Sequence, residues 1–133
     1  MKRRLAREMV LKVLFQLDIG NVDLDVALEN VLEEEESCRV RDFVRTLVKG
    51  TVDNLPKIDQ VINQFAHDWT VDRMAGVDRN LLRLAVYEVL FVDDIPSAVS
   101  INEAVELAKV YGTEESSKFI NGILGNVVRN VLA

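Results

Sequence analysis

Residues 77–92, VDRNLLRLAVYEVLFV, form the most apolar stretch of the chain. Its apolar residues recur in every turn, so a helix built from them is apolar on most sides. Such a helix is normally buried inside a fold rather than laid on its surface. Gly76 precedes the stretch, and Asp93-Asp94-Ile95-Pro96 ends it because a residue before proline disfavours helical backbone. We therefore predict that 77–92 is the central helix of the second half of the protein.

Six further segments have the apolar spacing that is typical of amphipathic helices. Their expected ranges are about 3–19, 24–36, 39–55, 56–69 and 100–111, followed by a last helix after Thr113. Ser100 and Glu103 predict a capping box at the start of the sixth helix, and Thr113 is expected to cap the seventh. Gly50 lies inside the third helix, where close approach of another helix would compensate for its low helix propensity. The sequence thus predicts an all-α fold of about seven helices.

The composition is that of one soluble domain. The chain has 133 residues, long enough to bury a sizeable core, with two prolines and six glycines. Cys38 is the single cysteine, which rules out an intramolecular disulfide and favours a reducing, cytoplasmic setting. No stretch approaches the roughly 20 apolar residues of a membrane span, and the start lacks the apolar region of a secretory leader. We expect a protein that is neither membrane-bound nor exported.

Charge is distributed unevenly along the chain, which has 16 Lys and Arg against 22 Asp and Glu and a net charge of −6. The first twelve positions contain one acidic residue, Glu8, and five basic residues: Lys2, Arg3, Arg4, Arg7 and Lys12. This segment has a charge of +4 and the rest of the chain −10. The pattern favours a local basic site over uniform polyanion binding. From the residues alone, the segment is a solvated terminus, a set of surface salt bridges or an arginine-rich RNA contact.

A second candidate contact lies at residues 112–119, GTEESSKF. The start of the last helix offers free backbone amides to a phosphate, and Ser116, Ser117 and Lys118 add side-chain donors. Phe119 provides a face on which a base can stack. Two acids, Glu114 and Glu115, argue against this interpretation. The alternative is an ordinary capped helix with Phe119 in the core.

No catalytic constellation is present in the sequence. His67 is the only histidine, and Cys38 follows an acidic run with no candidate base, so a nucleophile with its general base is not indicated. The glycine-containing stretch 121–125, NGILG, lacks the Lys-Ser/Thr of a phosphate loop. No Cys/His cluster has zinc-ligand spacing. We expect no enzymatic activity, no metal and no cofactor.

An ordered series of motifs closely resembles the NusB family of transcription antitermination factors. The motifs are LLRLA at 81–85, YE at 87–88, DIP at 94–96, INEAVELAK at 101–109, YGTE at 111–114 and KFINGIL at 118–124. The similarity continues backwards through Asp72-Arg73 and Trp69 to RLARE at 4–8 with Phe15. It covers nearly the whole chain and is far more specific than either basic patch.

The resemblance implies a non-catalytic protein of two packed helical subdomains, here expected at about 1–69 and 70–133. Members of this family bind boxA, a short single-stranded element of nascent RNA, together with the ribosomal protein NusE. With other Nus factors they help the transcribing RNA polymerase complex to read through terminators, notably in ribosomal RNA operons. The implied RNA-binding residues, with Lys2 added from the basic start, are Lys2, Arg3, Arg4, Arg7, Ser116, Lys118 and Phe119. The implied partner-binding residues are Asp78, Leu81 and Glu88.

Two departures from the family pattern bear on RNA affinity. The basic segment is shorter than in many relatives, and the sequence reaches Ala133 without a charged tail. Both predict weaker RNA binding by the protein alone. Two alternatives to the antitermination function are a non-catalytic protein-interaction module and the related RNA-binding domain of an RNA cytosine methyltransferase, which would make this chain a fragment.

Overall fold

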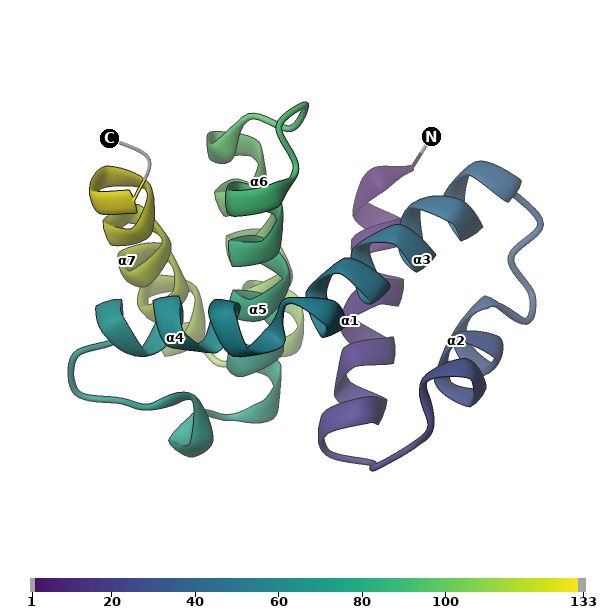
Figure 1. The fold of residues 1–133 in the computed structure, drawn as a ribbon, viewed down its shortest axis with the longest axis horizontal. Coiled ribbons are helices and arrows are strands. Elements are labelled where there is room, and N and C mark those ends of the chain that lie inside the picture. Colours follow the sequence, from purple (N-terminus) through teal and green to yellow (C-terminus); the bar gives the residue numbers. More distant parts are fainter. Residues whose placement is uncertain (1, 132–133) are drawn as a thin grey trace.

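The computed structural model describes residues 2–131, which fold into helices and connecting segments without a strand (Figure 1). The elements are α1 (Arg3–Asp18), α2 (Leu24–Leu32), α3 (Cys38–Asp53), α4 (Leu55–Phe65), a 3-10 turn η1 (Val71–Arg73), α5 (Gly76–Phe91), α6 (Ser97–Tyr111) and α7 (Glu114–Val131). The prediction of an all-α fold with seven helices is confirmed for this part of the chain. Ala133, on which the prediction of an uncharged tail rests, lies outside the described residues.

The helices form two packed groups, each around its own hydrophobic cluster. Figure 1 shows α1, α2 and α3 on one side and α4, α6 and α7 on the other. The boundary predicted near residue 69 is wrong, because Ile58, Val61 and Ile62 of α4 are buried in the second cluster. The change from one cluster to the other therefore falls between α3 and α4, close to Asn54.

Helix α5 is the central helix, as the sequence predicted. It contacts α1, α3, α4, α6 and α7, and eight of its 16 residues are buried. Leu84 belongs to the first cluster, while Leu81 and Leu82 belong to the second. Each buried leucine stabilises the fold by roughly 1.5–3 kcal/mol relative to an exposed one. A helix that is apolar on most sides can thus fill both clusters and join them.

Helices α1 and α5 run antiparallel and are joined by polar contacts at both ends. Near the start of α1, Arg7 pairs with Glu88 near the end of α5. At the end of α1, Asp18 accepts hydrogen bonds from Arg79, Asn80 and Arg83 in the first half of α5. These contacts fix how far one helix is displaced along the other.

Gly50 allows α3 to approach α5 closely, which confirms the reason proposed for a glycine inside a helix. A Cβ atom at position 50 would lie 2.1 Å from the hydroxyl oxygen and from the adjoining ring carbon of Tyr87. No heavy atom fits at such a distance. The absence of a side chain at Gly50 is therefore what makes room for the Tyr87 ring.

Two helices end earlier than predicted. The second ends at Leu32 instead of residue 36, where Arg41 Nη1 donates to the carbonyl oxygens of Leu32 (2.7 Å) and Glu35 (2.9 Å). The acidic residues that follow Leu32 would also interact unfavourably with the negative end of a longer helix. The fourth ends at Phe65, so Trp69 lies in the following loop and is 50% exposed.

The predicted capping box is wrong. Helix α6 begins three residues earlier, at Ser97 after Pro96, so Ser100 lies inside it. The Ser100 hydroxyl donates to Glu88 of α5, and Glu103 pairs with Arg4. Both side chains thus connect helices instead of capping one.

No described helix combines the length and hydropathy that a membrane span needs.

Candidate nucleic-acid interface

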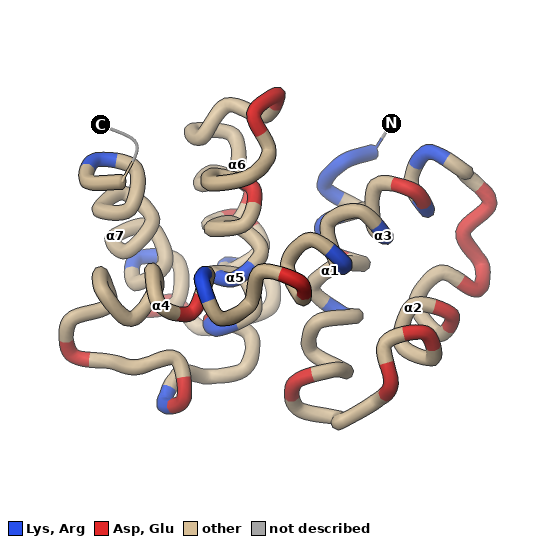
Figure 2. Tube along the Cα trace, in the orientation of Figure 1, with Lys and Arg blue, Asp and Glu red and all other residues tan. Residues whose placement is uncertain are grey.

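The basic start of the chain comprises the residue before α1 and the first turn of this helix, and we call Lys2, Arg3 and Arg4 the arm. All three arm residues are exposed. The arm lies beside the start of α3, where Figure 2 shows further basic residues near the amino end. The guanidinium carbon of Arg3 lies 5.1 Å from the centre of the Phe43 ring of α3. Lys2 and Arg3 have no ion pair among the described residues, so their charges face solvent.

Arg4 differs from its neighbours because it already has an acidic partner. Its Nε atom lies 2.7 Å from Oε2 of Glu103 on α6. The hydrogen bond and the charge of Glu103 raise the pKa of Arg4 above its ordinary value. With 59% of its side chain exposed, Arg4 remains accessible, but Glu103 offsets part of its charge.

Arg7 is not part of the exposed basic surface, which corrects its prediction as an RNA contact. The residue is 2% exposed and donates from Nε and Nη2 to the carboxylate of Glu88 at 2.7–3.2 Å. Ser100 donates to the same carboxylate at 3.0 Å. A guanidinium that is enclosed and paired in this way is not accessible to a phosphate on the surface.

The second predicted patch, at the start of α7, is only partly exposed. Ser116 is 3% exposed, and its hydroxyl oxygen accepts from the backbone N–H of Thr113 at 3.0 Å. This hydrogen bond closes the start of the helix, so the predicted donor is buried and its hydroxyl is engaged within the protein. Lys118 is exposed, and Phe119 is partly buried against the second cluster. Two residues of this patch, Lys118 and Phe119, therefore remain as candidates.

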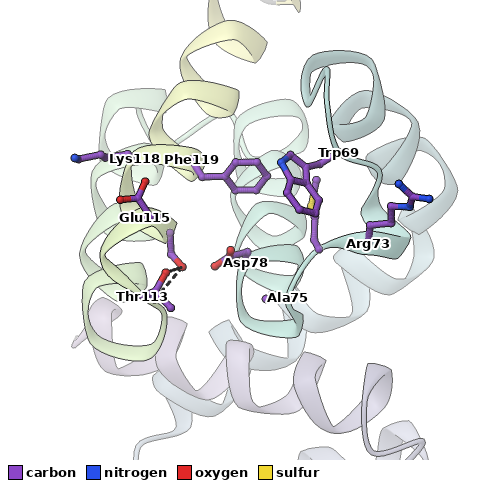
Figure 3. Close-up of a pocket in the computed structure, with 10 residues that line it drawn as sticks. Trp69, Arg73, Ala75, Asp78, Thr113, Glu115, Lys118 and Phe119 are labelled. Atoms are coloured by element: carbon purple, nitrogen blue, oxygen red, sulfur yellow. Dashed lines mark hydrogen bonds between the residues drawn. The ribbon is translucent and has the colours of Figure 1, made fainter.

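The start of α7 borders a cavity of about 580 Å³. Its lining comes from the loop after α4, from η1 and α5, and from the beginning of α7, and consists of Trp69, Arg73, Met74, Ala75, Asp78, Thr113, Glu115, Ser116, Lys118 and Phe119. Figure 3 shows the Phe119 ring directed toward Trp69, with Asp78 on the α5 side. The cavity thus combines two aromatic rings with two basic side chains, Arg73 and Lys118. Trp69 is not expected at this cavity from the sequence, because the fourth helix is predicted to include it.

Asp78 is the one partner-binding candidate that reaches this cavity. Its Oδ1 atom is buried and has no hydrogen-bond partner among the described residues. Buried carboxylate oxygens are normally satisfied, so an incoming donor would be favourable here. Leu81 and Glu88 were predicted to share the partner surface, but they are 0% and 1% exposed. Both belong to the interior, because α5 turns these positions toward α6 and the clusters.

The arm and the start of α7 do not meet in one pocket. Arg4 contacts Glu103 in the first half of α6, and α7 begins just after the end of α6. From Glu103 to Gly112 the helix rises about 13 Å. An extended ligand running along α6 would span both patches.

Among residues 2–131, no three His, Cys, Asp or Glu side chains are grouped so that they could hold a metal ion.

Comparison with known proteins gives a consistent result. The family model described as the NusB family matches residues 4–129. The transcription antitermination protein NusB of Pelotomaculum thermopropionicum is 51% identical over 132 residues, covering 98% of this chain and 91% of that protein. The protein of the same name from Listeria monocytogenes is 46% identical over 127 residues, covering 96% of each chain.

Solved structures agree with the sequence relatives. T. maritima NusB superposes with a TM-score of 0.91 and 43% identity, covering 98% of this chain and 92% of that one. A crystal structure of the antitermination factors NusB and NusE in complex with dsRNA matches with a TM-score of 0.88 and 28% identity, covering 97% and 98% of the two chains. The family model, the relatives and the folds all lead to the same assignment: this chain is a member of the NusB family.

Proposed function

We propose that this protein is a transcription antitermination factor that binds boxA-like RNA together with the ribosomal protein NusE. In the cytoplasm, as part of the transcribing RNA polymerase complex with other Nus factors, it promotes read-through of terminators, notably in ribosomal RNA operons. It does so by binding alone, without catalysis. Relatives named as antitermination proteins and a similar NusB chain in complex with NusE and RNA support the proposal.

The observation that carries this proposal is the composition of the cavity at the start of α7. Lys118 and Phe119, proposed RNA contacts, line the same cavity as Asp78, the proposed partner contact. A ligand and a protein partner bound at these residues would touch each other as well as this chain. Such an arrangement explains why RNA and NusE would bind together better than either binds alone.

Each proposed contact has a stated physical role. Lys2, Arg3 and Arg4 supply positive charge for phosphates, with Arg4 contributing less because Glu103 is close. Phe119 offers a stacking face to an unpaired base, and Lys118 holds the adjacent phosphate. Asp78 accepts a hydrogen bond from a basic side chain of NusE, which is attracted by the acidic body of the protein.

A binding comparison tests the proposal. Single-stranded boxA-like RNA and a scrambled RNA of equal length are titrated with the protein, with and without NusE. We expect the boxA-like RNA to bind more tightly, and the difference to grow when NusE is present. Equal affinity for both RNAs in the presence of NusE would contradict the function, and binding of NusE with no measurable affinity for either RNA would favour a protein-interaction module.

A matched variant localises the binding. Lys118→Ala removes a charge at the cavity, while Lys57→Ala removes the same charge from exposed Lys57 in the first turn of α4, outside both patches. Only the first change should weaken RNA binding. Equal effects would mean that the protein attracts RNA through its overall charge instead of through the proposed site.

A further inference from the structure

Phe43 of α3 lies between the arm and the interior of the protein. Its ring centre is 5.1 Å from the guanidinium carbon of Arg3 and 6.0 Å from that of Arg7. The ring is partly buried and packs against the first hydrophobic cluster. One aromatic side chain therefore contacts an exposed arginine and a buried arginine at the same time.

The buried arginine is held in place. Arg7 is fixed by its hydrogen bonds to Glu88, which in turn accepts from Ser100 of α6. Because these groups are enclosed, the Phe43 ring rests against a part of the molecule that does not move easily. Arg3 has no such restraint from ion pairs among the described residues, and its guanidinium lies over the Phe43 ring.

A guanidinium over an aromatic ring is well suited to RNA binding. Stacking restricts the rotamers of a long side chain, so less freedom is lost when RNA binds. The N–H groups around the edge of the guanidinium stay available for a phosphate, and its other face can stack on an unpaired base. Phe43 thus places the Arg3 charge without using any of its donors.

We propose that Phe43 is a positioning residue for RNA binding, which holds Arg3 in the orientation that contacts the RNA. The inference rests on the proposed function and extends the interface from α1 to α3. Phe43 acts through Arg3 and does not itself read the RNA. Arg7 contributes from the inside, by supporting the ring.

A double-mutant cycle tests this relationship. The RNA affinity of the unaltered protein is compared with those of Phe43→Leu, Arg3→Ala and the double variant, with NusE present. Loss of the ring should weaken binding by about two- to fivefold, the size expected of an exposed cation–π contact. In the Arg3→Ala background the same change should have no further effect. An equal loss in both backgrounds would overturn the proposal and make Phe43 a purely structural residue.

Two controls separate positioning from folding. Phe43→Tyr keeps the ring and should restore the affinity. Phe65→Leu removes a partly buried ring from the second cluster and should leave RNA affinity unchanged, even if it lowers the unfolding temperature. Failure of rescue by tyrosine in a folded protein would also count against the proposal.

The double-mutant cycle still tests the positioning role of Phe43 if the proposed function is wrong. Running it on boxA-like and scrambled RNA shows whether the protein prefers one sequence, which tests the function, and whether Phe43 and Arg3 are coupled, which tests the positioning role. Coupling on both RNAs without a preference would retain the role of Phe43 and reject the specific function. Binding to neither RNA would reject both.

Discussion

Arg7 of α1 and Glu88 of α5 form an ion pair inside the protein, with Nη2 2.7 Å from Oε1 and at most 3% of either side chain exposed. The pair joins the first helix to the central helix across 81 positions of sequence. Its position separates Arg7 from the exposed arm, although the two are neighbours in the chain. The protein thus divides its basic residues between charges that stabilise the fold and charges that remain accessible.

Removing one partner of the pair should destabilise the protein strongly. Arg7→Ala leaves Glu88 buried without its counter-charge, and losses of about 3–5 kcal/mol are typical of such changes. Urea unfolding followed by circular dichroism measures the loss. The double variant Arg7→Met, Glu88→Leu should lose much less, because no charge remains buried. A stable Arg7→Ala protein with reduced RNA affinity would instead return Arg7 to the RNA interface.

The arm should determine how RNA affinity depends on salt. Release of counterions from a single strand gives a slope of roughly −0.7 in log affinity against log salt for each phosphate contacted. Arg3→Ala should flatten the slope by about 0.7. Arg4→Ala should flatten it less, because Glu103 already offsets part of its charge. Arg129→Ala, at the far end of α7, serves as the control and should leave the slope unchanged.

Phe119 should act differently from the arm. Stacking on an aromatic ring contributes roughly 1–3 kcal/mol per base and depends little on charge. Phe119→Leu keeps most of the packing against the second cluster but removes the stacking face. The affinity for boxA-like RNA should fall while the salt slope stays constant. An unchanged affinity would show that Phe119 is only a core residue, and a changed slope would show that the substitution alters phosphate contacts instead of stacking.

Asp78 should control association with NusE. Charges at an interface mainly change the association rate, so Asp78→Lys should slow binding several-fold without altering the helical circular-dichroism spectrum. Glu34→Lys makes the same charge change in the exposed segment between α2 and α3 and is the matched control. Surface plasmon resonance compares the two rates. Equal rates would mean that only net charge matters. Glu88→Lys is unsuitable for this test because it would place a lysine in the interior.

Asp18 should make stability depend on pH. Burial alone would raise its pKa, but hydrogen bonds from Arg79 and Asn80 and the charges of Arg79 and Arg83 outweigh burial and lower it. The stabilisation is therefore complete above the unfolded value of about 3.9 and is lost as the pH falls through the lower folded value. The stability difference between the unaltered protein and Asp18→Asn should shrink below about pH 4. Asp23→Asn makes the same substitution at an exposed residue without a side-chain capping bond and is the matched control.

The features that could be predicted from sequence depend on local patterns. Helix α5 was identified because its apolar residues continue around every face, and Gly50 because glycine inside a helix needs a close neighbour to compensate for it. The errors have non-local causes. The capping pattern at Ser100 fails because the helix already begins at Ser97, directly after Pro96. The Ser100 hydroxyl instead donates a hydrogen bond to Glu88 of α5.

The candidate site shows the same limit. Counting charges in the first twelve residues could not separate Arg7 from Arg3, because the partner that removes Arg7 from the surface lies in another helix. Nor could helical periodicity place Trp69 at the cavity, since that requires knowing that α4 ends at Phe65. Local sequence indicates which residue types are available, and the packing of distant helices decides which of them are accessible.

The contact between Gly50 and Tyr87 restricts how this protein can diverge. A methyl group at position 50 would occupy space already filled by the tyrosine ring, so α3 would have to move away from α5. An ancestor or descendant that acquires alanine at position 50 would need a smaller residue at position 87 at nearly the same time. The two positions should therefore be inherited as a pair, although 37 positions separate them in the sequence.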